Sequence, residues 1–174
     1  MARIVEWKPK TTCPLDVIDY LTQHGVYYEH WDLDHLPTRL RTGWDLSGPE
    51  RIATIESLAD RLGRVAESFG YISYDLVILA PEVTPDLDQA LETYRKPHHH
   101  SEDEVRLVID GEVAYTMTAN GATFTVVLEP GDLISIPAGV SHFFELTQGQ
   151  RLKAVRLFQS QAGWVAQFDP LGVF

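Results

Sequence analysis

The 174-residue sequence is poor in cysteine, in long apolar runs and in positive charge. Cys13 is the only cysteine, so no disulfide can form within the chain, and a bound metal would need nitrogen and oxygen ligands. No segment approaches the ~20 apolar residues that span a bilayer, and the first residues lack an apolar signal core. The chain has 14 basic and 25 acidic residues, and the resulting net charge of -11 disfavours nucleic acid and anionic membranes as partners. We therefore expect a cytoplasmic protein.

The remaining composition is that of a globular protein. Hydrophobic residues make up 44% of the chain, and no linker, charge block or repeat divides it. We expect a single domain over residues 1–174. No coiled coil or long exposed apolar run demands a partner, so we also expect a monomer.

The first half, residues 1–97, reads as helix and strand units. The patterns predict a short helix over 14–24, a strand over 26–31, an irregular loop over 32–47, a long amphipathic helix over 49–69, a strand over 71–79 and a third helix from 84 to 97. Gly25 and Gly70 suit the residue that follows a helix, and Pro97 breaks the last one. About three helices are thus expected, all in this half.

The second half reads almost entirely as strand and turn. Strands are predicted over 105–109, 113–118, 123–128, 133–136, 143–146 and 152–158, with Asn120-Gly121 as a hairpin turn. Short strands at this spacing are typical of an antiparallel barrel or sandwich. The fold class is therefore mainly β, with the helices peripheral.

Candidate metal ligands lie at two places in this half. In an extended strand alternate side chains share a face, so His98, His100 and Glu104, together with Arg106, point one way, and His99 points the other. A second segment, 131–142, runs through a Pro-Ala-Gly turn to His142, which could point at the same centre. Buried Glu and His need a partner, and one metal ion accounts for all four. His24, His30 and His35 are read as structural, hydrogen-bonded residues.

The spacing of these residues resembles the two cupin motifs, here at 98–111 and 131–142. Within the cupins, three segments resemble the bacterial acireductone dioxygenase family. They are Asp103-Glu104-Val105-Arg106, Asp132-Leu133-Ile134-Ser135-Ile136-Pro137-Ala138-Gly139 and Ala154-Val155-Arg156-Leu157-Phe158. The N-terminal half is similar in order as well. The resemblance implies a jelly-roll barrel that holds one Fe(II) or Ni(II) ion per chain on His98, His100, Glu104 and His142.

The same resemblance implies an activity. The expected substrates are O₂ and 1,2-dihydroxy-3-keto-5-methylthiopentene, an acireductone of the methionine salvage pathway. With Fe(II) the implied products are 4-methylthio-2-oxobutanoate and formate. With Ni(II) they are 3-methylthiopropanoate, formate and carbon monoxide. The ligand set itself is compatible with several divalent metals.

Two arginines are the candidate catalytic residues. Arg106 shares the face of Glu104 and could stabilise a dianionic substrate, although a salt bridge to Glu102, Asp103 or Glu104 is the alternative. Arg156 matches a charged position of the family, but its facing is ambiguous from the sequence. Candidates for an apolar wall around the methylthio tail are Leu107, Phe144 and Trp164, although a barrel core needs such residues anyway and the core role is favoured for each of them singly.

Two other functions stay open at this point. One is another cupin metalloenzyme, such as a sugar-phosphate isomerase, which would not consume O₂. The other is a binding or sensor module with a structural metal and closed coordination.

Overall fold

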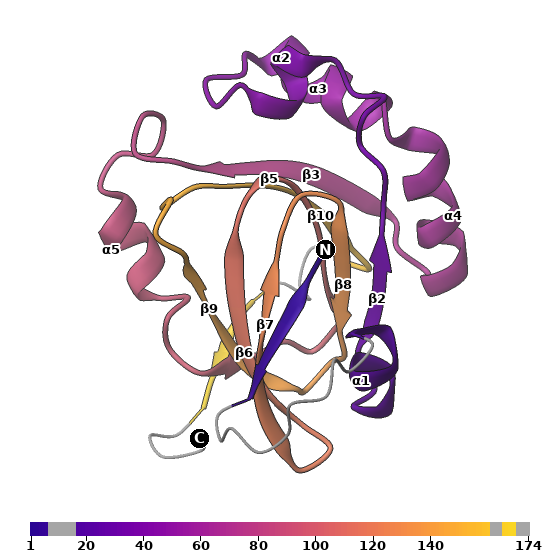
Figure 1. Cartoon of the computed structure of the whole chain (residues 1–174), viewed down its shortest axis with the longest axis vertical. Coiled ribbons are helices and arrows are strands. Elements are labelled where there is room, and N and C mark those ends of the chain that lie inside the picture. Colours follow the sequence, from indigo (N-terminus) through magenta and orange to yellow (C-terminus); the bar gives the residue numbers. More distant parts are fainter. Residues whose placement is uncertain (7–16, 161–164, 170–174) are drawn as a thin grey trace.

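The computed structural model describes residues 1–6, 17–160 and 165–169. They form two antiparallel sheets that face each other, with the helices of residues 38–69 along one outer side and the helix of residues 87–92 on another side (Figure 1). No helix among these residues is long and apolar enough to cross a membrane. The expected β-rich cupin fold is confirmed, as a two-sheet jelly roll.

The larger sheet has six strands in the order β1-β7-β6-β9-β4-β11. Their bounds are β1 Arg3–Glu6, β4 His98–His99, β6 Val113–Ala119, β7 Ala122–Leu128, β9 Ser141–Leu146 and β11 Gln167–Phe168. The predicted hairpin joins β6 to β7, and both Asn120 and Gly121 have the positive φ that a tight two-residue turn requires.

The smaller sheet has five strands in the order β2-β8-β5-β10-β3. Their bounds are β2 Tyr27–His30, β3 Ser73–Leu79, β5 Glu104–Gly111, β8 Asp132–Ile136 and β10 Leu152–Phe158. Gly131 precedes β8 with φ +93°, and a Cβ there would lie 2.3 Å from the carbonyl oxygen of Trp31. Only glycine therefore fits where β2 and β8 begin to pair.

Both faces of the smaller sheet are buried. One face, which carries Val108, Ile134 and Ala154, meets the larger sheet across an apolar core. The other face carries Leu107, Leu133 and Val155 and packs under the helices. Strand β5 is consequently buried on both sides, and its two sets of alternate side chains serve two different layers.

Five helices occur in the described residues, two more than expected. They are α1 Val17–Gln23, α2 Thr38–Thr42, α3 Gly48–Glu56, α4 Ala59–Phe69 and α5 Leu87–Glu92. The expected loop over 32–47 contains α2, whose single turn is too short to give a periodic pattern. The third helix is also shorter than expected, since α5 covers only part of 84–97.

The prediction of one helix over 49–69 is wrong. It is divided between α3 and α4, at Ser57 and Leu58. The Ser57 hydroxyl donates to the carbonyl of Ala53, four residues earlier, a contact that bends helices. Leu58 is buried at the bend, so the chain can redirect its apolar face onto the sheet.

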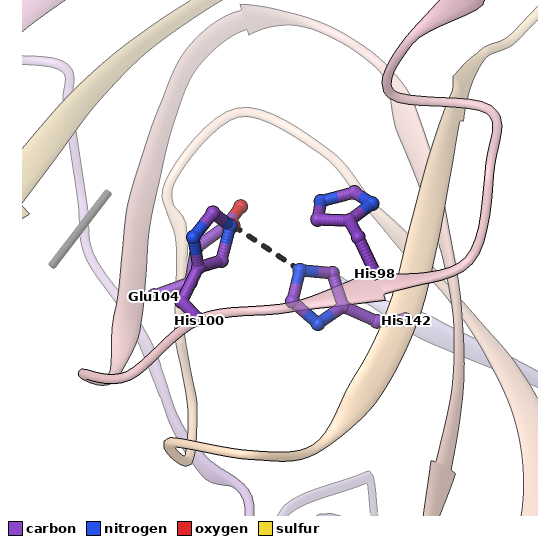
Figure 2. Close-up of side chains that lie close together, drawn as sticks. All are labelled: His98, His100, Glu104 and His142. Carbon is purple, nitrogen blue, oxygen red and sulfur yellow. Dashed lines mark hydrogen bonds and ion pairs between the residues drawn. The ribbon is translucent and has the colours of Figure 1, made fainter. Parts of the chain in front are cut away.

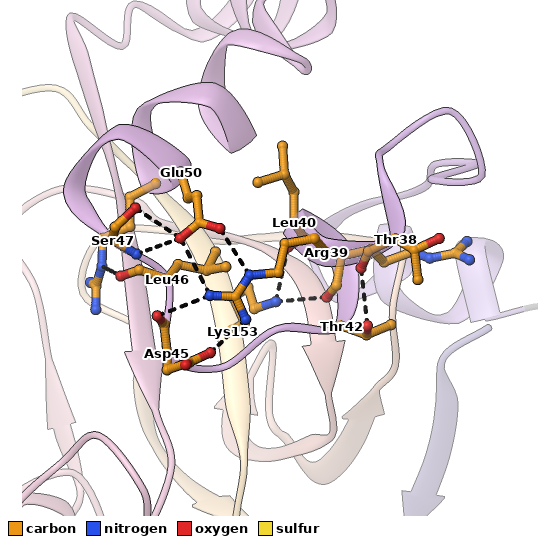
Figure 3. A network of polar contacts seen from close by, with 11 residues as sticks. Thr38, Arg39, Leu40, Thr42, Asp45, Leu46, Ser47, Glu50 and Lys153 are labelled. Atoms are coloured by element: carbon orange, nitrogen blue, oxygen red, sulfur yellow. Dashed lines mark hydrogen bonds and ion pairs between the residues drawn. The ribbon is translucent and has the colours of Figure 1, made fainter.

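A buried lysine ties the helical layer to the smaller sheet (Figure 3). A register shift between Lys153 and Ala154 interrupts the pairing of β10 with β5, and the fully buried Lys153 lies on the helical side. Its Nζ donates to the carbonyl oxygens of Leu40 at 3.0 Å and Arg41 at 2.6 Å, at the end of α2. The amine also lies 5.2 Å from the ring centroid of Trp44. Burial lowers the pKa of Lys153 to about 8.

This anchor predicts a specific dependence of stability on pH. In the unfolded chain Lys153 keeps its ordinary pKa of 10.5, so between pH 8 and pH 10.5 the unfolded chain binds more protons there than the folded chain. Wild type should therefore gain stability relative to Lys153→Met across this window, as measured by urea unfolding. Lys96→Met, at an exposed lysine, is the control. If the difference in unfolding free energy between wild type and Lys153→Met stayed constant with pH, burial would not lower the pKa of Lys153.

Candidate metal centre

Four potential ligand side chains converge inside the barrel (Figure 2). His98 lies on β4, Glu104 begins β5, His142 lies on β9, and His100 lies in the bend between β4 and β5. Their relative exposures are 1% for His98, 6% for His100, 2% for Glu104 and 1% for His142. The expectation that these side chains point inward is thus confirmed.

The two sequence motifs are joined by backbone contacts as well as by the side chains. His98 is directly opposite His142 in the β4–β9 pair. The Gly139 amide donates to the carbonyl of His100 at 2.9 Å, and the Ala138 amide donates to the Asp103 carboxylate at 2.9 Å. The Pro-Ala-Gly turn therefore holds the segment that carries His100, and hydrogen bonds join the two motifs.

One oxygen of Glu104 faces the imidazoles. Its Oε2 lies 3.0 Å from Nε2 of His100 and 3.2 Å from Nε2 of His142. Nδ1 of His98 lies 2.7 Å from the carbonyl of Lys96, and Nδ1 of His142 lies 2.8 Å from that of Val140. Because a carbonyl accepts, these Nδ1 atoms carry a proton, so in the neutral ring the lone pair lies on Nε2, where a metal can bind. Nε2 of His142 donates to Glu104 only in the doubly protonated ring.

The other oxygen of Glu104 is held by two neighbours. Oε1 accepts from Nε of Arg106 at 2.9 Å and from the hydroxyl of Tyr115 at 2.9 Å, and Arg106 Nε also lies 3.0 Å from that hydroxyl. All three side chains are buried. This triangle fixes the plane of the carboxylate, so that Oε2 stays directed at the imidazoles. The sequence analysis missed Tyr115. Its position in the alternating segment 113–118 could have indicated that it faces the interior, and a buried tyrosine hydroxyl needs a hydrogen-bond partner.

The charges of the centre favour an ionised carboxylate. Burial alone would raise the pKa of Glu104, but the Arg106 guanidinium and the hydrogen bonds from His100 and His142 hold that pKa well below its usual range. Burial lowers the pKa of His98. Burial also opposes protonation of His142, but its hydrogen bond to Glu104 outweighs this and raises its pKa.

The residues present fit a divalent metal ion. The four ligand atoms lie within 4.8 Å of one another, whereas two atoms bound to one ion at about 2.1 Å are at most about 4.2 Å apart. A small contraction would bring all four into bonding range. Three imidazoles and one carboxylate suit Fe, Ni, Co or Mn better than Ca or Mg. This buried group could therefore hold a metal ion.

The two candidate arginines lie side by side on the smaller sheet. Arg156 on β10 is directly opposite Arg106 on β5 and Asp75 on β3, and its Nε donates to Asp75 at 2.8 Å. Of the three carboxylates that the sequence analysis considered as salt-bridge partners of Arg106, Glu104 is the one that Arg106 contacts. Glu102 and Asp103 instead accept from the Ser160 and Ala138 amides.

The remaining site predictions have mixed outcomes. Phe144 lies in the core beside Arg106, whose guanidinium carbon is 5.9 Å from the ring centroid. Leu107 has the core role that the sequence analysis favoured and does not line the site, because it alternates with Arg106 and faces the helices. Trp164 lies outside the described residues. His99 faces away from the group and bonds Asp169 at 2.8 Å.

Comparisons with known proteins agree with this geometry. The family model described as the ARD/ARD′ family matches residues 19–166. The chain belongs to this family. Two relatives named acireductone dioxygenase come from Sulfurihydrogenibium sp. (35% identical, covering 90% of this chain and 87% of the relative) and Bacillus pumilus (36%, covering 88% of each). The family also includes a solved structure, described as acireductone dioxygenase from Bacillus anthracis with a cadmium ion in its active centre. It is 32% identical, covers 96% of each chain and has a TM-score of 0.88.

The four-residue group predicts stoichiometric metal binding, with one ion per chain. Alanine at His98, His100, Glu104 or His142 should weaken the binding, because each removes one ligand, whereas His99→Ala should leave it nearly unchanged. Titration of divalent metal into metal-free protein measures this. Uptake should fall below about pH 6.5, where imidazoles protonate. Full occupancy in a Glu104→Ala/His142→Ala double variant would place the metal elsewhere.

The triangle at Oε1 predicts that Tyr115 helps to set metal affinity without being a ligand. Tyr115→Phe removes one of the two donors that orient Glu104, and such changes typically cost about 10- to 100-fold in affinity. Competition with a chelator of known affinity measures the loss. Tyr71→Phe is the matched control, since Tyr71 is also a buried tyrosine but bonds Ser135 on the helical side of the sheet. Equal metal affinities in Tyr115→Phe and Tyr71→Phe would show that the Tyr115 hydroxyl does not help to set metal affinity.

Proposed function

We propose that this chain is a metal-dependent acireductone dioxygenase, in which His98, His100, Glu104 and His142 hold one Fe(II) or Ni(II) ion. The observation that carries the proposal is the buried ligand group, in a chain whose relatives bear that name over nearly their whole length. Its substrates would be O₂ and 1,2-dihydroxy-3-keto-5-methylthiopentene, and its place the methionine salvage pathway. A six-coordinate ion on these four ligands would offer two positions for a chelating substrate.

The protein's own residues support this chemistry in three ways. Burial of all four ligands within the barrel excludes bulk water, which strengthens electrostatic interactions with a charged substrate. Arg106 lies beside Glu104 and, in this proposal, stabilises the dianion. Arg156 lies next to Arg106 in the sheet, where its ion pair with Asp75 holds it in position, and in this proposal it assists Arg106.

The apolar part of the substrate needs an apolar wall. Phe144 is 3% exposed, stacks on Tyr94 with ring centroids 5.1 Å apart and also contacts the ring of Tyr115. We assign the methylthio tail to the side of the site where Phe144 lies. The ring is held on two sides, so it presents a fixed surface.

The metal should select the products, because the ligand set does not discriminate strongly between Fe(II) and Ni(II). One batch of metal-free protein, divided and loaded with each ion, should give 4-methylthio-2-oxobutanoate and formate with Fe(II). With Ni(II) it should give 3-methylthiopropanoate, formate and carbon monoxide. Product analysis under O₂ with freshly generated acireductone measures both.

Each contrary outcome has its own meaning. Identical products from the two forms would show that the protein, and not the metal, directs cleavage. Metal binding without turnover or O₂ consumption by either form would instead favour an isomerase or a binding module. The Glu104→Ala/His142→Ala variant serves as the control for reaction catalysed by free metal.

A further inference from the structure

The C-terminal strand β11 forms one edge of the larger sheet, beside the strand that carries His98. Strand β4 has only two residues, and it pairs with β9 where His98 lies opposite His142. Both residues of β4 also pair with β11, whose Phe168 lies opposite His98. The ring centroids of Phe168 and His98 are 6.0 Å apart. The position of His98 therefore depends on β11 as well as on β9.

One carboxylate joins the end of β11 to both strands that carry histidine ligands. Oδ1 of Asp169 lies 2.8 Å from Nδ1 of His99 on β4. Its Oδ2 accepts from the hydroxyl of Ser141, the first residue of β9. The Asp169 amide also donates to the carbonyl of Pro97 at 3.0 Å. Asp169 thus contacts both chain neighbours of His98 and the beginning of β9.

The surroundings of this carboxylate keep it ionised. The Asp169 side chain is 10% exposed. Burial opposes its ionisation, but the hydrogen bonds from Ser141 and His99 outweigh this and lower the pKa of Asp169. An ionised carboxylate only accepts, so the His99 ring and the Ser141 hydroxyl both donate to it. The carboxylate, and not the imidazole, lies in the middle of the three, so this is not a Ser-His-Asp catalytic group.

These three residues lie behind the metal centre. The strand pairings place His99, Ser141 and Asp169 on one face of the larger sheet, and alternation places His98 and His142 on the other. On that inner face the rings of His98 and His142 lie side by side, with centroids 4.7 Å apart (Figure 2). A bridge on the outer face therefore fixes the separation of two strands whose inner side chains converge on one point.

From these contacts we propose that Asp169 is a positioning residue of the metal centre, which holds β4 and β9 at the separation that lets His98 and His142 bind one ion. The proposal rests on the metal-binding part of the proposed function and not on the reaction. The two bonds of the carboxylate support each other, since either one keeps Asp169 attached to a ligand-bearing strand. A nearly silent His99→Ala variant agrees with this, because the bond to Ser141 persists.

The test measures how fast Co(II) leaves the loaded full-length protein when a chelator competes for the ion. Asp169→Ala should release Co(II) at least about tenfold faster than wild type, as expected when a group that orients a metal ligand is removed. His99→Ala/Ser141→Ala should show the same increase, because it removes the same two bonds. Asp169→Asn should release Co(II) at nearly the wild-type rate, since an amide can accept from His99 and donate to the Ser141 hydroxyl.

Asp132→Ala is the matched control. Asp132 is a buried carboxylate that also accepts from a histidine and a hydroxyl, those of His30 and Tyr28, and from the Glu129 amide. None of these partners is next to a ligand in the sequence, so Co(II) release should stay at the wild-type rate. The visible absorption bands of bound Co(II) report its coordination geometry, and they should change in Asp169→Ala but not in Asp132→Ala.

The contrary outcomes are distinguishable. Equal release rates in wild type, Asp169→Ala and the double variant would overturn the role of Asp169 and leave the metal centre intact. Equally fast release from Asp132→Ala would also overturn it, because the effect would then be a general loss of stability. Failure of wild type to bind Co(II) would overturn the metal centre itself. Should Asp169→Ala not fold, as judged by urea unfolding, His99→Ala/Ser141→Ala carries the same test.

Discussion

The structure depends on how one buried carboxylate is stabilised. An isolated ionised carboxylate inside a protein costs many kcal/mol, so Glu104 must have partners in every direction where water is missing. Arg106 and Tyr115 occupy one oxygen, and His100 and His142 face the other. A divalent ion bound at Oε2 would add the strongest of these partners. Removing one of these partners would therefore leave the buried carboxylate less well compensated.

Strand β5 shows how such a site is combined with a stable fold. Its alternate residues Glu104 and Arg106 face the interior, whereas Val105 and Leu107 face the helices. The helical layer thus stabilises the strand from behind by burying apolar surface, which the polar interior residues cannot supply. Lys153 strengthens this layer on the neighbouring strand β10, where the register shift directs its amine to the end of α2. The polar centre and its apolar support are two faces of one sheet.

Much of this could be predicted from the sequence, because the controlling rule is simple. Alternation places Glu104 and Arg106 on one face of β5, and the structure has them there. The strand does not continue from His98 to Glu104, however, because β4 and β5 belong to different sheets, and the ligands meet because these two sheets face each other. The same rule, applied consistently, excludes Leu107 from the site. Tyr115 could have been inferred from the cost of burying a hydroxyl, but only long-range pairing reveals that Glu104 is its partner. The bend at Ser57 and the register shift at Lys153 leave no periodic signal, since each results from tertiary packing.

The orientation of several buried or half-buried histidines follows one principle. A ring whose Nδ1 donates to a fixed oxygen has only Nε2 left, and the direction of Nε2 is then set by the backbone or carboxylate that accepts. For His98 and His142 the acceptors are carbonyls two residues before each ring, so the strand itself directs Nε2 toward the centre. For His30 the acceptor is Asp132, 102 residues away, and the orientation depends on tertiary structure. The first arrangement can be recognised from sequence spacing, and the second only from the folded chain.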